Sequence, residues 1–296
     1  MPAATNHAPL TTGCSMRQLL RRVLPDRLYT RLGIARDRFA LARFRSYVTR
    51  HRYGGFELAV HIDDEMARGW YDQDWPMPAE IATLVERGRL REGARVFDIG
   101  AHQGVVAMIL GKLVGAEGHV VAVEATPHNA AVARKNVALN AVTQVTVVHA
   151  AGSDAPGVLQ FSPRMNGHVA AADEASVDVR ALTVDELSSE HGAPQVLFVD
   201  VEGYELHVLR GAHRTLAEHR PDLFVEVHMG EGLERFGNAD DLLALIPDGY
   251  EVLVSKTDAG PYVPLAEGRA ILRGHSRLVA LGSLRDARAG TRTRTP

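Results

Sequence analysis

Two pairs of ionisable residues stand at the ends of two hydrophobic stretches in this sequence. Asp200 and Glu202 close the first stretch, and Glu226 and His228 close the second. Residues two apart on a strand point to the same side, so each pair can present its side chains to one space. Carboxylates and an imidazole in such a place can take a proton from a hydroxyl group or hold a divalent cation. We therefore expect Asp200, Glu202, Glu226 and His228 to carry the chemistry of this chain.

A glycine-containing turn over Val96–Gly104 provides a second set of candidates. Its sequence, Val-Phe-Asp-Ile-Gly-Ala-His-Gln-Gly, spaces the glycines as Asp-x-Gly-x-x-x-Gly. The turn that cradles a pyrophosphate reads Gly-x-Gly-x-x-Gly instead, so an NAD-dependent oxidoreductase is the weaker alternative. Asp98, just before the turn, suits the cationic amino-acid part of S-adenosylmethionine (SAM). The turn therefore predicts a SAM site.

Further residues fit the same cofactor. Glu124 ends the next hydrophobic stretch and offers two carboxylate oxygens to a ribose diol. Asp154 follows the stretch after that and can receive the adenine amino group, the alternative being a plain turn aspartate. The predicted cofactor residues are Asp98, Gly100, His102, Gly104, Glu124 and Asp154.

Short hydrophobic stretches alternate with helical patterns through residues 91–284, and this alternation must position the candidates. Expected strands cover 95–99, 119–124, 144–149, 195–200, 222–228 and 250–255. Such alternation predicts an α/β, Rossmann-like fold, with a mostly parallel sheet covered by helices on both faces. The β-rich run 270–281 is expected to add an antiparallel edge strand, and 158–182 a hairpin or substrate-facing insertion.

The motif after the fourth of these strands resembles a known family. Asp-Val-Glu-Gly-Tyr-Glu over Asp200–Glu205, with Arg-Gly-Ala at 210–212 and Glu-Val-His at 226–228, is similar to the FkbM family of SAM-dependent O-methyltransferases. The similarity covers roughly residues 95–253. It implies a class I methyltransferase fold with seven strands, and methylation of hydroxyls on sugars, polyketides and related natural products. A basic residue often precedes the motif in the family, whereas this chain has Phe198 there.

Two mechanisms are open for methyl transfer to a hydroxyl group. In the first, which we favour, His228 or one of the carboxylates removes the hydroxyl proton directly. In the second, Asp200, Glu226 and His228 hold Mg²⁺, which acidifies the hydroxyl; this version resembles catechol-type O-methyltransferases. A non-catalytic SAM-binding module is the remaining alternative. The expected acceptor is a small molecule or glycoside, with a sugar hydroxyl as the first choice.

Composition sets the broader limits. The chain has 296 residues, is 46% hydrophobic and carries a net charge of -3, so we expect no nucleic-acid partner. A single cysteine, Cys14, favours a reducing compartment, and we expect a cytoplasmic protein with no export signal or membrane span.

The expected organisation has four parts: a flexible tail (1–15), a mainly helical N-terminal extension (16–90), the methyltransferase domain (91–284) and a second flexible tail (285–296). Hydrophobic residues spaced by three and four through 16–52 predict an amphipathic, Arg-rich helical region. Its charged face is expected to be solvated, with contact to an anionic membrane surface as the alternative.

Overall fold

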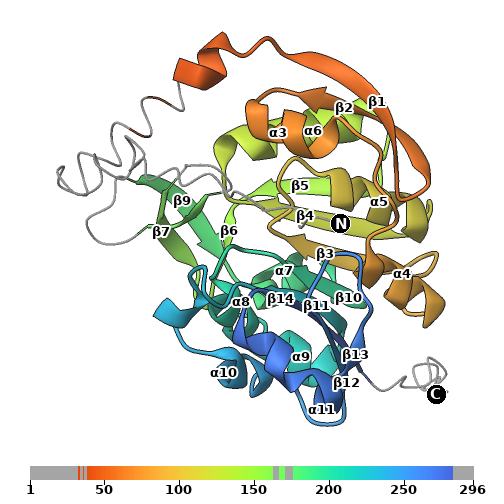
Figure 1. Ribbon diagram of the computed structural model, residues 1–296, viewed down its shortest axis with the longest axis vertical. Coiled ribbons are helices and arrows are strands. Elements are labelled where there is room, and N and C mark those ends of the chain that lie inside the picture. The colour runs from red at the N-terminus through yellow and green to blue at the C-terminus, as the bar shows by residue number, and fades with distance from the viewer. Residues whose placement is uncertain (1–32, 34–35, 37–38, 163–166, 171–175, 283–296) are drawn as a thin grey trace, which may run out of the picture.

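A computed structural model of the chain describes residues 33, 36, 39–162, 167–170 and 176–282. Within these residues one sheet has eight strands, in the order β13-β12-β14-β11-β10-β3-β4-β5 (Figure 1). The strands are β3 (Arg95–Ile99), β4 (His119–Glu124), β5 (Val145–His149), β10 (Val196–Val199), β11 (Asp222–Val227), β12 (Glu251–Ser255), β13 (Val263–Pro264) and β14 (Ser276–Leu281). The run from β5 to β11 is parallel, which confirms the predicted mostly parallel α/β sheet.

The predicted late antiparallel strand is present as β14, but it is not the outermost strand. It pairs antiparallel with β11 on one side and with β12 on the other. Five of its six residues are buried, with Arg277 half-buried, so this strand suits the inside of the sheet better than an edge. The two-residue strand β13 lies outside β12 instead.

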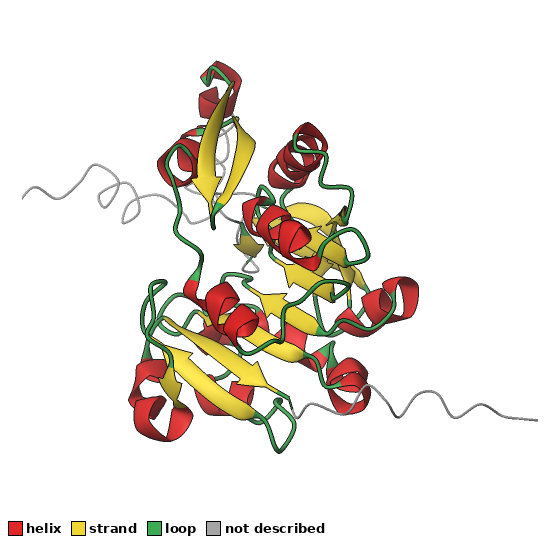
Figure 2. Ribbon diagram, turned by 90° about the vertical axis from the view of Figure 1, so that its right-hand side faces the viewer, coloured by secondary structure: helices red, strands yellow, loops and turns green. Residues whose placement is uncertain are grey.

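Helices cover both faces of the sheet, as Figure 2 shows. Alternate strand residues enter two hydrophobic clusters: Val96 packs with α4 and α5 on one face, and Phe97 with α7, α8 and α9 on the other. The helices are α3 (Glu65–Tyr71), α4 (Ala79–Glu86), α5 (Val105–Val114), α6 (Pro127–Leu139), α7 (Val184–His191), α8 (Glu205–Arg210), α9 (His213–His219), α10 (Ala239–Leu243) and α11 (Leu265–Gly268), with 3-10 turns η1 (Leu233–Arg235) and η2 (Arg269–Arg273). None of these described helices has the length and hydrophobicity needed to cross a membrane.

The N-terminal extension differs from the expected run of helices. An antiparallel hairpin of β1 (Tyr47–Tyr53) and β2 (Phe56–Ile62) precedes α3 and α4. The helical pattern expected to reach Arg52 was wrong over 47–52. The amides of Asn136 and Asn140 on α6 bind the backbone of β2, so a distant helix holds the hairpin. Most of the Arg-rich region lies outside the described residues.

The insertion expected at 158–182 forms a small sheet of its own. Its strands are β6 (Ala151–Gly152), β7 (Gly157–Ser162), β8 (His168–Val169) and β9 (Val177–Leu182), in the order β6-β9-β7-β8. The antiparallel pairing of β7 with β9 is the predicted hairpin. Residues 163–166 and 171–175 within it lie outside the described range.

The turn after β3 lies directly against the chain that leaves β10. Gly100 has φ +97°, and a Cβ atom built on it would lie 1.6 Å from the backbone oxygen of Asp200. Only glycine allows both this conformation and this approach. The glycine turn and the acidic motif, about a hundred residues apart, therefore meet at the sheet edge.

Gly100→Ala should lower the free energy of unfolding by about 3 kcal/mol or more, because left-handed strain adds to a backbone overlap. Gly55→Ala is the matched control, since Gly55 also has positive φ but open space around it, and should cost about 1 kcal/mol. Chemical denaturation measures both. Equal losses would show that the contact with Asp200 is unimportant.

Candidate functional site

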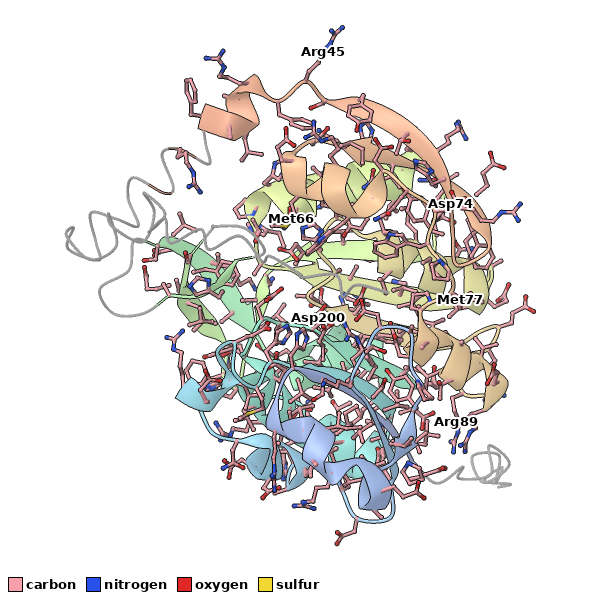
Figure 3. The ribbon with its side chains drawn as sticks, in the orientation of Figure 1. Arg45, Met66, Asp74, Met77, Arg89 and Asp200 are labelled. Carbon is pink, nitrogen blue, oxygen red and sulfur yellow. The ribbon has the colours of Figure 1, made fainter. Side chains whose placement is uncertain are left out.

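Two adjoining cavities open where β3, β4, β10 and β11 end. The first is lined by Glu124, the segment Ala150–Gly152, Phe161 and Tyr204, among others. The second, of ≈ 770 Å³, extends toward α3, α4 and β14. The two linings have five residues in common: Trp70, Gly100, His102, Asp200 and Glu202. Figure 3 shows Asp200 near the middle of the molecule.

Glu124 fixes the wall of the first cavity. It is 5% exposed, and its two carboxylate oxygens accept hydrogen bonds from the backbone N–H of His102 (2.9 Å) and of Thr126 (2.6 Å). Burial raises the pKa of Glu124 to about 7 despite these bonds. Glu124, the residue predicted to bind the ribose, thus lines the cavity and also ties the glycine turn to β4.

Asp98 is a buried carboxyl group with one oxygen left without a partner. It is 4% exposed, lines the second cavity, and its Oδ2 forms no hydrogen bond with the described residues. Burial raises its pKa to about 7. A ligand ammonium group would supply the missing partner, so the residues present fit the amino-acid part of SAM.

Of the other predicted cofactor residues, some line a cavity and some do not. His102 lines both cavities, bonds to the Tyr71 hydroxyl through Nδ1 (2.6 Å), and has its pKa lowered by burial to about 4, so it is neutral. Gly104 precedes α5 with φ +80° and lines neither cavity. Asp154 is also outside both linings, because it pairs with His207 at 2.8 Å. The small residues just before Asp154 line the first cavity in its place.

His228 is the centre of the predicted catalytic group. Its Nδ1 lies 2.7 Å from Glu205, a fully buried residue, and its Nε2 lies 3.8 Å from Asp200 and 3.6 Å from Glu202. Burial alone would lower the pKa of His228, but the hydrogen bond to Glu205 and the three surrounding carboxylates raise it to about 9. The imidazole is therefore protonated at neutral pH.

Asp200 faces the junction of the two cavities. Its side chain is 43% exposed, on the surface that both cavities share. Its partly enclosed position between the cavities, together with the charge of nearby Glu226, raises its pKa well above the usual range. A carboxylate of raised basicity at this place is suited to accept a proton.

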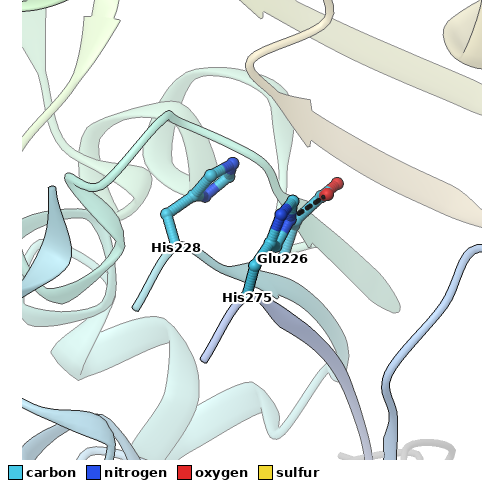
Figure 4. A group of neighbouring side chains, drawn as sticks. All are labelled: Glu226, His228 and His275. Carbon is cyan, nitrogen blue, oxygen red and sulfur yellow. Dashed lines mark hydrogen bonds and ion pairs between the residues drawn. The ribbon is translucent and has the colours of Figure 1, made fainter. Parts of the chain in front are cut away.

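Glu226 is hydrogen-bonded to two side chains at or just before the start of β14. Its Oε1 accepts hydrogen bonds at 2.7 Å from Arg277 and at 2.7 Å from His275, whose ring stacks on His228 (Figure 4). These contacts leave Glu226 less free than Asp200 to act on a ligand.

Two overlapping groups of side chains can hold a metal ion. One comprises Asp200, Glu202 and His228, and the other Glu226, His228 and His275, each with ligand atoms within 4.8 Å of one another. The predicted set of Asp200, Glu226 and His228 is thus divided between two groups that share His228.

The residues of this site that sequence reasoning left unassigned include Trp70, Glu205, His275 and Arg277. Glu205 belongs to the recognised motif, and its place three residues after Glu202 was a usable signal. Trp70 is carried to the site by α3. His275 and Arg277 reach the site because β14 lies beside β11, a pairing that no local pattern reveals.

The chain matches the methyltransferase FkbM domain model over residues 98–252. The chain belongs to the FkbM methyltransferase family. Membership confirms the resemblance seen in the Asp200–Glu205 motif, and the sheet order agrees with a class I methyltransferase fold.

Curated relatives match parts of the chain. Protein-L-isoaspartate O-methyltransferase 1 of Archaeoglobus fulgidus is 30% identical over 45% of this chain and 61% of its own length. The protein of that kind from Ignicoccus hospitalis is 37% identical over 26% of this chain and 36% of its own. The chain therefore spans less than two thirds of the curated relatives it matches.

Solved structures with similar folds include the methyltransferase FkbM from Methylobacillus flagellatus KT, with TM-score 0.42 and 19% identity over 63% of this chain and 43% of that one. Aeropyrum pernix fibrillarin with bound SAM has TM-score 0.41 and 15% identity, over 82% of this chain and 86% of that one.

Asp98→Asn should stabilise the ligand-free protein while weakening SAM binding. The pKa of Asp98 is raised on folding, so ionisation costs stability as the pH rises above the unfolded value, and the full cost applies above about pH 7. At pH 8 the free energy of unfolding of the variant should be higher by about 1–3 kcal/mol, and at pH 5 the gain should be smaller. Its affinity for SAM should fall about tenfold or more.

Thermal unfolding and calorimetry measure these effects, with the exposed Asp178→Asn as a control that changes neither. A loss of stability at pH 8, or unchanged SAM affinity, would contradict the role given to Asp98.

Proposed function

We propose that this chain transfers the methyl group of SAM to a hydroxyl oxygen of a small acceptor, with a sugar hydroxyl as the first choice. The observation that supports this is the pair of cavities that meet at Asp200. The first cavity suits the nucleoside and Asp98 the amino acid, while the second has room for an acceptor. Beyond Asp98 the second cavity extends to α4 and β14, and a module that only binds SAM has no need of this further space.

Asp200 serves as the general base. SAM supplies the methyl group, which passes from sulfur to the acceptor oxygen and leaves S-adenosylhomocysteine. As the hydroxyl oxygen gains the methyl group, its proton moves to the carboxylate of Asp200 and then to solvent. Asp200 suits this step because it faces both cavities and its pKa is raised.

His228 is not the general base, although the sequence made it a candidate for that role. With a pKa of about 9 it already carries its proton, so it is not the base at neutral pH. Glu205 holds the ring through Nδ1 and leaves Nε2 facing Asp200 and Glu202. We assign His228 to orienting these carboxylates and to balancing their charge.

The lining of the second cavity argues against a carboxylate acceptor of the kind that the isoaspartate enzymes' name implies. Among the described residues Arg277 is its one guanidinium, and Arg277 is already paired with Glu226 and Asp258. The acidic members of the lining are Glu80, Asp98, Asp200, Glu202, Glu226, Glu231 and Asp258. A negatively charged acceptor would be repelled.

A metal-assisted version is the second candidate, favoured by the close grouping of Asp200, Glu202 and His228. A divalent cation held there would acidify the acceptor hydroxyl. The base mechanism is preferred because Asp200 can take the proton without it.

A screen of hydroxylated compounds with methyl-labelled SAM tests the function, and the product should be a methyl ether. With the acceptor so found, Asp200→Asn should lower kcat by about 10²–10⁴-fold because the base is lost. Asp240→Asn, an exposed aspartate paired with Arg269, is the control and should leave kcat unchanged. A methyl ester or N-methyl product would contradict the proposal.

Removal of metal ions separates the two mechanisms. The base mechanism predicts that dialysis against a chelator leaves the turnover rate unchanged. Loss of turnover that added Mg²⁺ restores would instead establish the metal-assisted version.

A further inference from the structure

The outer part of the second cavity holds more acidic groups than its cation can balance. Arg277 binds Glu226 and Asp258 with its two terminal nitrogens, each at 2.7 Å. Glu80 is a third carboxyl group near this guanidinium, but it forms no ion pair with it. One guanidinium thus faces three carboxyl groups, and both of its terminal nitrogens are already in use.

Glu80 is the group left over. It lies in the first turn of α4, lines the second cavity and is only 8% exposed. Its carboxyl group accepts a hydrogen bond from its own backbone N–H but forms no ion pair with the described residues, and burial raises its pKa to about 7 despite that bond. A carboxyl group so removed from water is costly unless a cation meets it.

Aromatic rings also line this cavity. Trp70, Tyr71 and Trp75 line the cavity on the stretch of chain that leads to Glu80. The rings of Tyr71 and Trp75 lie 5.3 Å apart, and the indole N–H of Trp75 donates to the backbone oxygen of Trp70 (2.7 Å), which holds the group together. The faces of such rings attract ammonium groups and also pack on the apolar faces of sugars.

We propose that the acceptor carries a protonated amino group that Glu80 binds, as in an amino sugar or another aminated, polyhydroxylated natural product. This inference rests on the proposed function and narrows its substrate class. The ammonium group satisfies the buried carboxylate and lies against the aromatic wall, while a hydroxyl of the same molecule reaches Asp200. A neutral acceptor would leave the carboxylate of Glu80 without a cationic partner, and an acidic acceptor would be repelled.

Calorimetry with the protein saturated with S-adenosylhomocysteine tests the proposal. The probes are kanamycin, an amino-sugar compound whose amines are protonated at neutral pH, and its fully N-acetylated form, which keeps the skeleton without the charge. Kanamycin should bind, and the acetylated form should bind about ten- to hundredfold more weakly.

Glu80→Gln should remove that preference, because it replaces the carboxylate with a neutral amide of the same shape. Glu86→Gln, an exposed residue on the same helix, is the matched control and should keep it. The proposal is overturned if kanamycin does not bind, if the acetylated form binds equally well, or if the two variants lose the same affinity. Binding of S-adenosylhomocysteine by every variant shows that the cofactor site is intact, so failure of the proposed function is seen separately.

Discussion

Carboxyl groups buried where the parallel strands end are the constraint on which the rest of this structure depends. A carboxylate removed from water needs hydrogen bonds or a cation. Glu124 takes two backbone N–H groups, and Glu205 takes the N–H of Gly203 and the ring of His228. Asp98 keeps an unpartnered oxygen, and Asp200 faces open cavity. Glu124 and Glu205 shape the site through these bonds, whereas Asp98 and Asp200 are placed to meet ligands.

The N-terminal extension contributes part of the lining of both cavities. Asp64 caps α3 and also binds His128 and Gln103; these bonds outweigh burial and lower its pKa to about 2. The extension is thereby tied to the glycine turn and to α6. Trp70 is carried by α3 to the boundary of both cavities.

Features set by local sequence were predictable, and features set by distant pairing were not. The limits of β3 and β4 follow from short hydrophobic runs before polar turns, and the predicted ranges match them. Strand β1 looked helical because its Arg-rich residues show no local alternation of hydrophobic and polar positions, and α6 stabilises it from far along the chain. Asp154 was a reasonable adenine candidate, but it pairs with His207, which comes from α8, more than fifty residues along the chain. The acidic motif was visible in the sequence, whereas the protonation of His228 depends on the fold, which places its ring beside the three carboxylates of that motif.

The most direct test of the account is a crystal structure of the protein with S-adenosylhomocysteine bound. The account predicts the nucleoside in the first cavity beside Glu124, the amino group on Asp98, and the sulfur facing Asp200 and the second cavity. A sulfur atom turned away from the second cavity, or an amino group that does not contact Asp98, would contradict it.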